Sequence, residues 1–109
     1  MKKTLIIATL FGLTAATSAL AADAKENWDK ICAKCHGADG KGDTKPGKKL
    51  DIKDLTDAKF QATFSDDDAF KALKSGLNDK DGKVRMKAAE GLSDDDMKAL
   101  VAYVRKLKA

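Results

Sequence analysis

Cysteine and histidine are scarce in this chain of 109 residues, which contains two cysteines and one histidine. A structural zinc site takes four such ligands, so the chain has too few of them to build one. Segments that alternate polar and apolar residues, as half-buried strands do, are also missing. This disfavours a thioredoxin-like dithiol protein, whose cysteines belong to a βαβ unit, and it predicts an all-α fold.

Neither sign of charge dominates, and aromatic residues are few. The formal net charge is +4, and aromatic side chains make up 6% of the chain. A nucleic-acid-binding protein would need a strong basic stripe, so this class is disfavoured. A small domain with few aromatic side chains buries little apolar surface, and such domains usually need a disulfide, a metal or a cofactor to be stable.

The N-terminal residues predict export. Two lysines precede the nearly uncharged run 5–20, and a small-x-small pattern ends at Ala21, which together are typical of a cleaved signal peptide. An uncleaved membrane anchor is the alternative, but the run is shorter than the roughly 20 apolar residues that span a bilayer. We therefore expect a cleaved signal peptide over 1–21, a single domain over 22–109, and a periplasmic location.

The rest of the chain is predicted to form helices joined by loops rich in glycine and lysine. Apolar residues recur at three- and four-residue spacing over 25–35, and the glycine-rich segment 37–42 ends that helix. Thr56 is expected to cap a short second helix. Ser65 and Ser93 are each followed by three aspartates, a pattern that predicts a capping box at the start of a helix.

Cys32, Cys35 and His36 form a C-x-x-C-H motif. Two thiols at this spacing on a helical turn can add to the two vinyl groups of one haem, and the histidine that follows the second thiol is then held beneath the iron. We predict that Cys32 and Cys35 attach the haem covalently and that His36 is the proximal iron ligand. A disulfide between the two cysteines is the alternative, but it leaves His36 without a role.

The chain resembles the class I, bacterial monohaem cytochromes c over nearly all of the expected domain. Trp28 lies four residues before the first cysteine, where this family has an aromatic residue, and Ala24 lies four residues earlier. The resemblance implies that the small Ala24 lets this helix cross the last one closely, and we expect Trp28, Leu100 and Tyr103 to meet at the crossing. Leu100 and Tyr103 match the hydrophobic and aromatic pair of the family's last helix, and the motif of 32–42 reads C-x-x-C-H-G-x-x-G-x-G. The resemblance implies four to five helices wrapped around one covalent haem c and its iron.

The second iron ligand must be a residue other than histidine, because the chain has only one. Pairing of methionine with histidine is usual in the family, and only Met86 and Met97 follow the expected signal peptide. Met97 fits the hydrophobic staple of the helix that Ser93 caps, where it would pair with Leu92. Met86 lies in the charged, non-periodic segment 82–87 before the last helix, so we predict that it is the distal ligand.

Two further positions bear on the ligands. A metal-bound histidine usually donates its other ring N–H to an acceptor that orients the ring, and Pro46 is the candidate that presents a backbone carbonyl to His36. Many relatives have proline where this chain has Ala88. We therefore expect the loop that carries Met86 to be less rigid here than in those relatives.

Basic residues gather in two loops of the chain. Removal of the two N-terminal lysines leaves 19 basic against 17 acidic side chains, a net charge of +2. The loops are either ordinary solvated segments or a positive collar that steers an acidic redox partner. We expect a monomer that contacts neither nucleic acid nor, after cleavage, a membrane. The basic residues of the two loops are Lys41, Lys45, Lys48, Lys49 and Lys53, and Lys83, Arg85 and Lys87.

The resemblance implies an electron carrier that transfers single electrons between periplasmic or membrane-bound redox proteins, and not an enzyme. One alternative is a haem sensor or small peroxidase, in which Met86 does not bind the iron. Another is a haem subunit held permanently in a larger complex. A ferric absorption spectrum separates the first alternative from the carrier, and sizing of native extracts separates the second.

Overall fold

The computed structural model describes residues 22–109, so the predicted signal peptide lies outside the described residues. Residues 22–27 are helical and continue into η1 (Trp28–Cys32) and α2 (Ala33–His36). Together these residues make one continuous first helix with a widened π-type turn in its middle. The helix ends at Gly37, whose φ of 84° is a conformation that glycine adopts at little cost.

Short helices and one small ribbon make up the remainder. The all-α prediction is confirmed apart from this two-stranded antiparallel ribbon, in which Leu77 pairs with Met86. Strands of two and three residues are too short to produce a visible alternation in the sequence. The other elements are α3 (Lys45–Lys49), α4 (Ala58–Gln61), α5 (Asp66–Ser75), β1 (Leu77–Asn78), β2 (Val84–Met86) and α6 (Asp94–Lys106).

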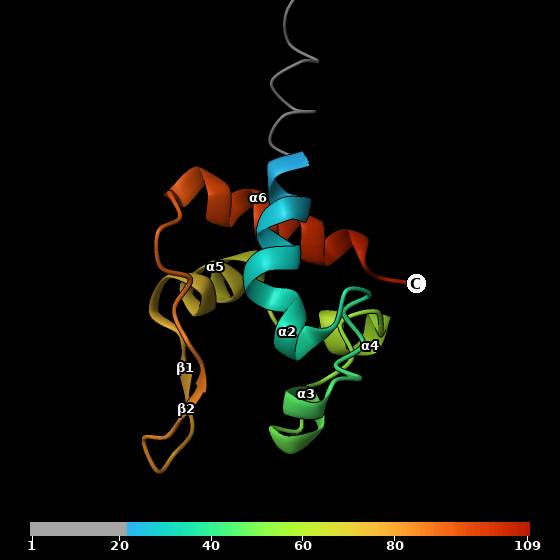
Figure 1. The fold of residues 1–109 in the computed structure, drawn as a ribbon, viewed down its shortest axis with the longest axis vertical. Helices are drawn as coiled ribbons and strands as arrows, with labels where there is room; N and C mark the ends of the chain where they lie inside the picture. Colours follow the sequence, from blue (N-terminus) through green and yellow to red (C-terminus); the bar gives the residue numbers. More distant parts are fainter. Residues whose placement is uncertain (1–21) are drawn as a thin grey trace, which may run out of the picture.

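The core lies where the first helix crosses α6 (Figure 1). Trp28 and Leu100 are the largest fully buried side chains, and Ala24 is 2% exposed, so the two helices approach closely. The ring centroids of Trp28 and Tyr103 are 5.5 Å apart. The predicted meeting of these aromatic and aliphatic residues is therefore confirmed. The buried hydrophobic core comprises Ala24, Trp28, Cys32, Leu55, Leu73, Ala89, Met97, Leu100 and Val101.

The helix caps confirm two predictions and correct a third. The side chains of Ser65 and Ser93 accept the backbone N–H three residues on, and both form complete capping boxes. The prediction for Thr56 is wrong, because Asp57 caps α4 and accepts the backbone N–H of Lys59. Thr56 instead donates its hydroxyl to Asp54 at 2.6 Å, so the aspartate before it takes the hydroxyl that was expected to cap.

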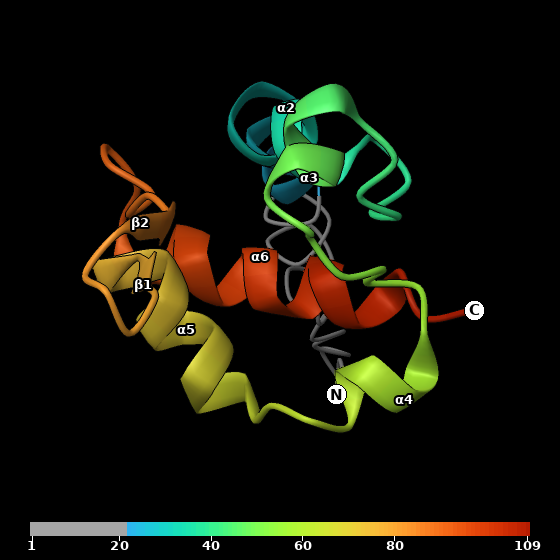
Figure 2. The ribbon, with the colours of Figure 1, turned by 90° about the horizontal axis from the view of Figure 1, so that it is seen from below.

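A polar network joins the α4–α5 segment to α6. Seen from below, α4 and α5 lie on one side of α6, with the first helix and α3 on the other (Figure 2). Arg105 donates to the backbone carbonyls of Gln61 and Phe64 at 2.6 and 2.7 Å. The buried Gln61 amide donates to the carbonyls of Leu55 and Val104, both at 2.7 Å. Over 22–109, none of the helices has the length and apolar character needed to cross a membrane.

Candidate functional site

The C-x-x-C-H motif lies at the C-terminal end of the first helix. Cys32 is the last residue of η1, and Cys35 and His36 belong to the final turn, α2. Both cysteines are free thiols, so they form no disulfide in this structure. Burial raises the pKa of the Cys32 thiol to about 11, with a smaller contribution from Cys35. Because the two cysteines lie three residues apart on the first helix, their thiols have the spacing that haem attachment requires.

The His36 imidazole has a buried ring nitrogen, Nδ1, without a hydrogen-bond partner among the described residues. Burial lowers the pKa of His36 below its usual value, which favours the uncharged form that ligates metals. The Pro46 prediction is wrong here, because the Pro46 carbonyl accepts the backbone N–H of Leu50 at 3.0 Å and not the imidazole.

The backbone around His36 is held by three specific donors. The Thr44 hydroxyl donates to the Cys35 carbonyl at 2.6 Å. The Gly42 N–H donates to the His36 carbonyl at 2.7 Å, and the Trp28 indole Nε1 donates to the Gly37 carbonyl at 3.2 Å. Three successive carbonyls at the end of the first helix, which would otherwise lack partners, are thus satisfied by two donors from the loop that follows the motif and by the Trp28 side chain of the same helix.

Thr44 is a site residue that the sequence analysis missed. It is the N-cap of α3, and its hydroxyl accepts the Gly47 N–H at 2.9 Å while it donates to Cys35. The signal was available, because threonine followed two residues later by proline is typical of a helix start. What could not be read from the pattern is that this cap also reaches back to the motif.

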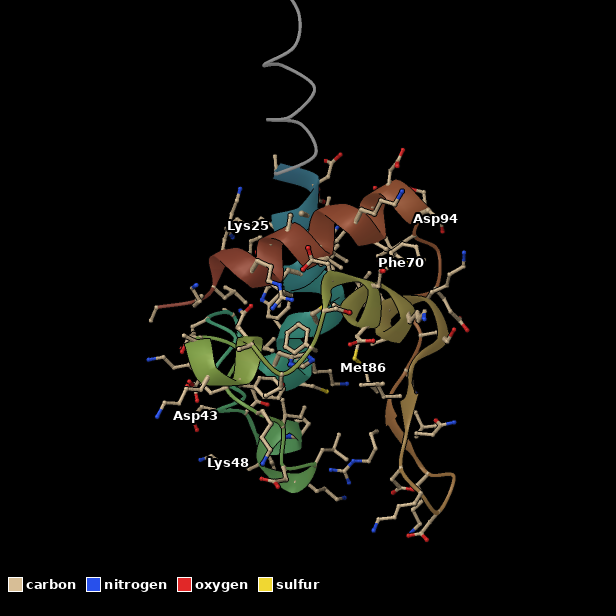
Figure 3. All side chains as sticks on the ribbon, turned by 180° about the vertical axis from the view of Figure 1, so that it is seen from behind. Lys25, Asp43, Lys48, Phe70, Met86 and Asp94 are labelled. Atoms are coloured by element: carbon tan, nitrogen blue, oxygen red, sulfur yellow. The ribbon has the colours of Figure 1, made fainter. Side chains whose placement is uncertain are left out.

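Met86 lies at the end of β2, in an element separate from the motif helix. It is half-buried, packs against the core cluster, and lines a cavity of about 560 Å³ together with Ile31, the residue before the first motif cysteine. Figure 3 shows the Met86 side chain pointing inward from the ribbon. Met97 is buried within the core on α6. The fold therefore brings Met86 and the motif helix to one cavity and uses Met97 for packing.

The residues of the motif, together with Met86 at the cavity, fit a covalently attached haem. Two free thiols, an imidazole and a thioether are the groups that such a haem takes from a protein. Ile31 and Leu77 are 44% and 49% exposed, so apolar surface is available to cover a porphyrin. Leu55 and Leu73 belong to the buried core, Phe70 packs against it, and Leu50 is half-buried.

The two basic loops are joined and partly neutralised. Arg85 on β2 donates to the Leu50 carbonyl at the end of α3, so the loops meet on one side of the molecule. Lys48 pairs with Asp43 at 3.2 Å, and Lys53 pairs with Asp51 at 3.6 Å. These exposed pairs contribute little to stability, but they reduce the positive field of the first loop.

Comparison with known proteins gives the family. The model of the cytochrome c family matches residues 21–108. Cytochrome c-554(547) of Halothiobacillus neapolitanus is 33% identical over 91 residues, which cover 81% of this chain and 97% of that protein. The solved structure of the KustC0563 c-type cytochrome superposes with a TM-score of 0.68 at 30% identity and covers 80% of this chain and 99% of its own.

These similarities extend over the first helix, the loops and the last helix alike. Proteins of this family are haem-based electron carriers, and the haem c that they carry is covalently bound and contains iron. The resemblance noted in the sequence is thereby confirmed. This chain belongs to the cytochrome c family, as a class I c-type cytochrome.

Proposed function

We propose that this cytochrome binds its haem through Cys32 and Cys35, ligates the iron with His36 and Met86, and carries single electrons between redox proteins. The observation that carries the proposal is that Met86 and Ile31 line the same cavity. Because Ile31 directly precedes the motif, this cavity lies between the segment that holds the thiols and the only methionine outside the core of residues 22–109.

Each residue has a distinct chemical task in this proposal. The two thiols add to the vinyl groups and fix the cofactor to one helical turn. The His36 imidazole, whose uncharged form burial favours, and the Met86 thioether would be the two protein ligands of the iron. When bound, haem c supplies an iron that takes up and releases one electron. A soft thioether favours the reduced state, which suits a carrier of relatively high potential.

The cellular context forms part of the same proposal. The predicted signal peptide of 1–21 directs the chain to the periplasm, and the domain begins at Ala22. The start of the family match at residue 21 supports this boundary. We propose that the carrier turns over no substrate of its own, because two protein ligands would leave the iron no open position. We also propose that it acts as a monomer.

The partner is proposed to be a redox protein with an acidic docking surface. Lys83, Arg85 and Lys87 flank the Met86 ribbon, and the two basic loops meet through the contact between Arg85 and the Leu50 carbonyl. Such a basic surface near the cavity attracts an acidic partner, with a rate that falls as ionic strength rises.

The absorption spectrum of the ferric protein tests the ligand set. We expect the weak far-red band that arises from sulfur bound to ferric iron, and we expect it in wild type and in Met97→Ala but not in Met86→Ala. High-spin features in wild type would instead support an open distal position, as in a haem sensor or small peroxidase. Loss of the band in Met97→Ala alone would transfer the ligand role to Met97.

A further inference from the structure

The direction of the His36 ring is not set by a hydrogen bond from the ring itself. Nδ1 is buried without a partner among residues 22–109, whereas metal-bound histidines usually have their second nitrogen held by an acceptor. Trp28 contacts the ring at a centroid distance of 5.6 Å with an interplanar angle of 36°, which restricts it on one side only. The backbone on either side of His36 must therefore provide the remaining orientation.

Both peptide planes that flank the His36 Cα are fixed by the loop that follows the motif. The plane before it contains the Cys35 carbonyl, which accepts from Thr44 Oγ1 at 2.6 Å. The plane after it contains the His36 carbonyl, which accepts from the Gly42 N–H at 2.7 Å. Gly42 is a backbone donor that no side-chain substitution removes, so Thr44 is the one contact of the two that depends on a side chain.

We propose that Thr44 is a positioning residue that sets the direction in which the His36 imidazole meets the haem iron. The inference rests on the proposed function, because it takes His36 as the proximal ligand. A hydroxyl can donate and accept at the same time, and Thr44 does both, to the Cys35 carbonyl and from the Gly47 N–H. The start of α3 is thereby coupled directly to the ligand segment.

The packing of Gly47 shows how closely α3 lies against the motif. A Cβ at this position would come within 2.6 Å of the Cys35 carbonyl oxygen and 2.3 Å of the Gly42 carbonyl oxygen. Glycine is therefore needed for the backbone of α3 to approach, and the Thr44 hydroxyl is the polar group that fixes this approach. Loss of the hydroxyl leaves the Cys35 carbonyl without its donor and frees the plane that precedes His36.

The test uses holoprotein variants that differ only in the hydroxyl. Thr44→Val removes it at nearly constant shape, and Thr44→Ser keeps it. Thr63→Val is the matched control, because Thr63 also donates its hydroxyl to a backbone carbonyl at 2.6 Å, that of Phe60, but at an exposed position away from the motif. The readouts are the contact-shifted haem methyl resonances of the ferric protein, which depend on the plane of the axial imidazole, the reduction potential, and amide hydrogen exchange.

We expect Thr44→Val to rearrange the haem methyl shifts, change the potential, and accelerate exchange of the Gly47 amide by about tenfold. Thr44→Ser and Thr63→Val should retain the wild-type pattern. Wild-type methyl shifts in Thr44→Val, or equal changes in the valine and serine variants, would overturn the inference. Should Thr44→Val fail to accumulate, amide exchange of the wild type decides. Gly42 and Gly47 amides that exchange as fast as they would in an unstructured peptide would also overturn the inference.

Measurements on the wild-type protein distinguish a failure of this inference from a failure of the proposed function on which it rests. Wild type that carries haem on the motif but shows no histidine ligation would overturn the proposed ligand set and this inference with it. Wild type with histidine ligation and indistinguishable Thr44 variants would overturn the positioning role alone.

Discussion

The two sides of the proposed haem site are built in different ways. On the His36 side, three successive backbone carbonyls accept hydrogen bonds from Thr44, Gly42 and the Trp28 indole, and Trp28 packs beside the ring. On the Met86 side, the proposed ligand ends a three-residue strand whose first residue, Val84, is 56% exposed. One side is held by backbone contacts and a packed core, and the other by a short ribbon at the surface.

This difference separates two requirements of a haem protein. Cys32, Cys35 and His36 lie in consecutive turns of one helix, so the attached haem and the backbone contacts of this helix hold one another in a fixed geometry. The distal ligand has only to reach the iron once the haem is in place, and a ribbon that packs lightly can do so. Stability and haem attachment should therefore depend on the first helix, whereas the electronic properties of the iron should depend on the ribbon.

Removal of both attachment thiols should have the largest effect. We expect Cys32→Ala/Cys35→Ala to be exported without covalent haem and to remain largely unfolded, because the small core lacks the cofactor that fills it. Mass spectrometry and far-ultraviolet circular dichroism measure the two outcomes. Met86→Ala is the control and should retain covalent haem. A double variant with the helical content of wild type would show that the first helix and α6 suffice for folding.

Substitutions in the core and in the ribbon should differ strongly in their effect on stability. Trp28→Ala removes a side chain that is 2% exposed at the helix crossing, and we expect a loss of about 3–5 kcal/mol in the free energy of unfolding. Val84→Ala on the exposed strand should change it by less than about 0.5 kcal/mol. Denaturant unfolding of the two holoproteins provides the values, and similar losses would contradict the contrast between the two sides.

The two methionines should divide the electronic and structural effects between them. We expect Met86→Ala to lower the reduction potential and to open the iron to added ligands, because the lost thioether favours the ferrous state. Met97→Ala should mainly destabilise the protein, by about 2–5 kcal/mol, since Met97 is buried in the core. Potentiometric titration and denaturant unfolding of both variants distinguish the roles, and exchanged outcomes would mean that the ligand is Met97.

A small effect is expected at the start of α5, which packs on α6 away from the motif. The backbone N–H and the hydroxyl of Ser65 hold the pKa of Asp68 below its usual value of 3.8. Because this pKa is lowered in the folded state, the stabilisation is present above pH 3.8 and is lost as the pH falls through the folded-state pKa. In Ser65→Ala the pKa of Asp68 should rise towards 3.8 in an NMR titration, whereas Ser93→Ala should leave it unchanged.

Local signals in the sequence predicted much of the fold. Both capping boxes, the extent of the first helix and its crossing with the last helix were predicted, because a cap depends on residues three positions apart and a buried face on helical periodicity. The cap of α4 was misplaced by one residue because Asp54 takes the Thr56 hydroxyl. Competition between neighbouring polar side chains is decided by backbone geometry that the residue types alone do not specify.

Contacts between distant segments could not be predicted. The ribbon depends on pairing between two very short strands, and the Arg105 contacts join residues more than 40 positions apart. In the candidate site, the motif and the methionine were visible as residue types at a given spacing. The contact between Thr44 and the Cys35 carbonyl was not, because its nine-residue separation follows from how the glycine loop folds back.

Peptide mapping of the exported protein by tandem mass spectrometry tests the central proposal most directly. The account predicts one haem on a single peptide that contains both Cys32 and Cys35, bound through thioether links to both sulfurs. It also predicts that the mature chain begins at Ala22. A peptide with two unmodified thiols, or with a disulfide between Cys32 and Cys35, would contradict the proposed attachment site.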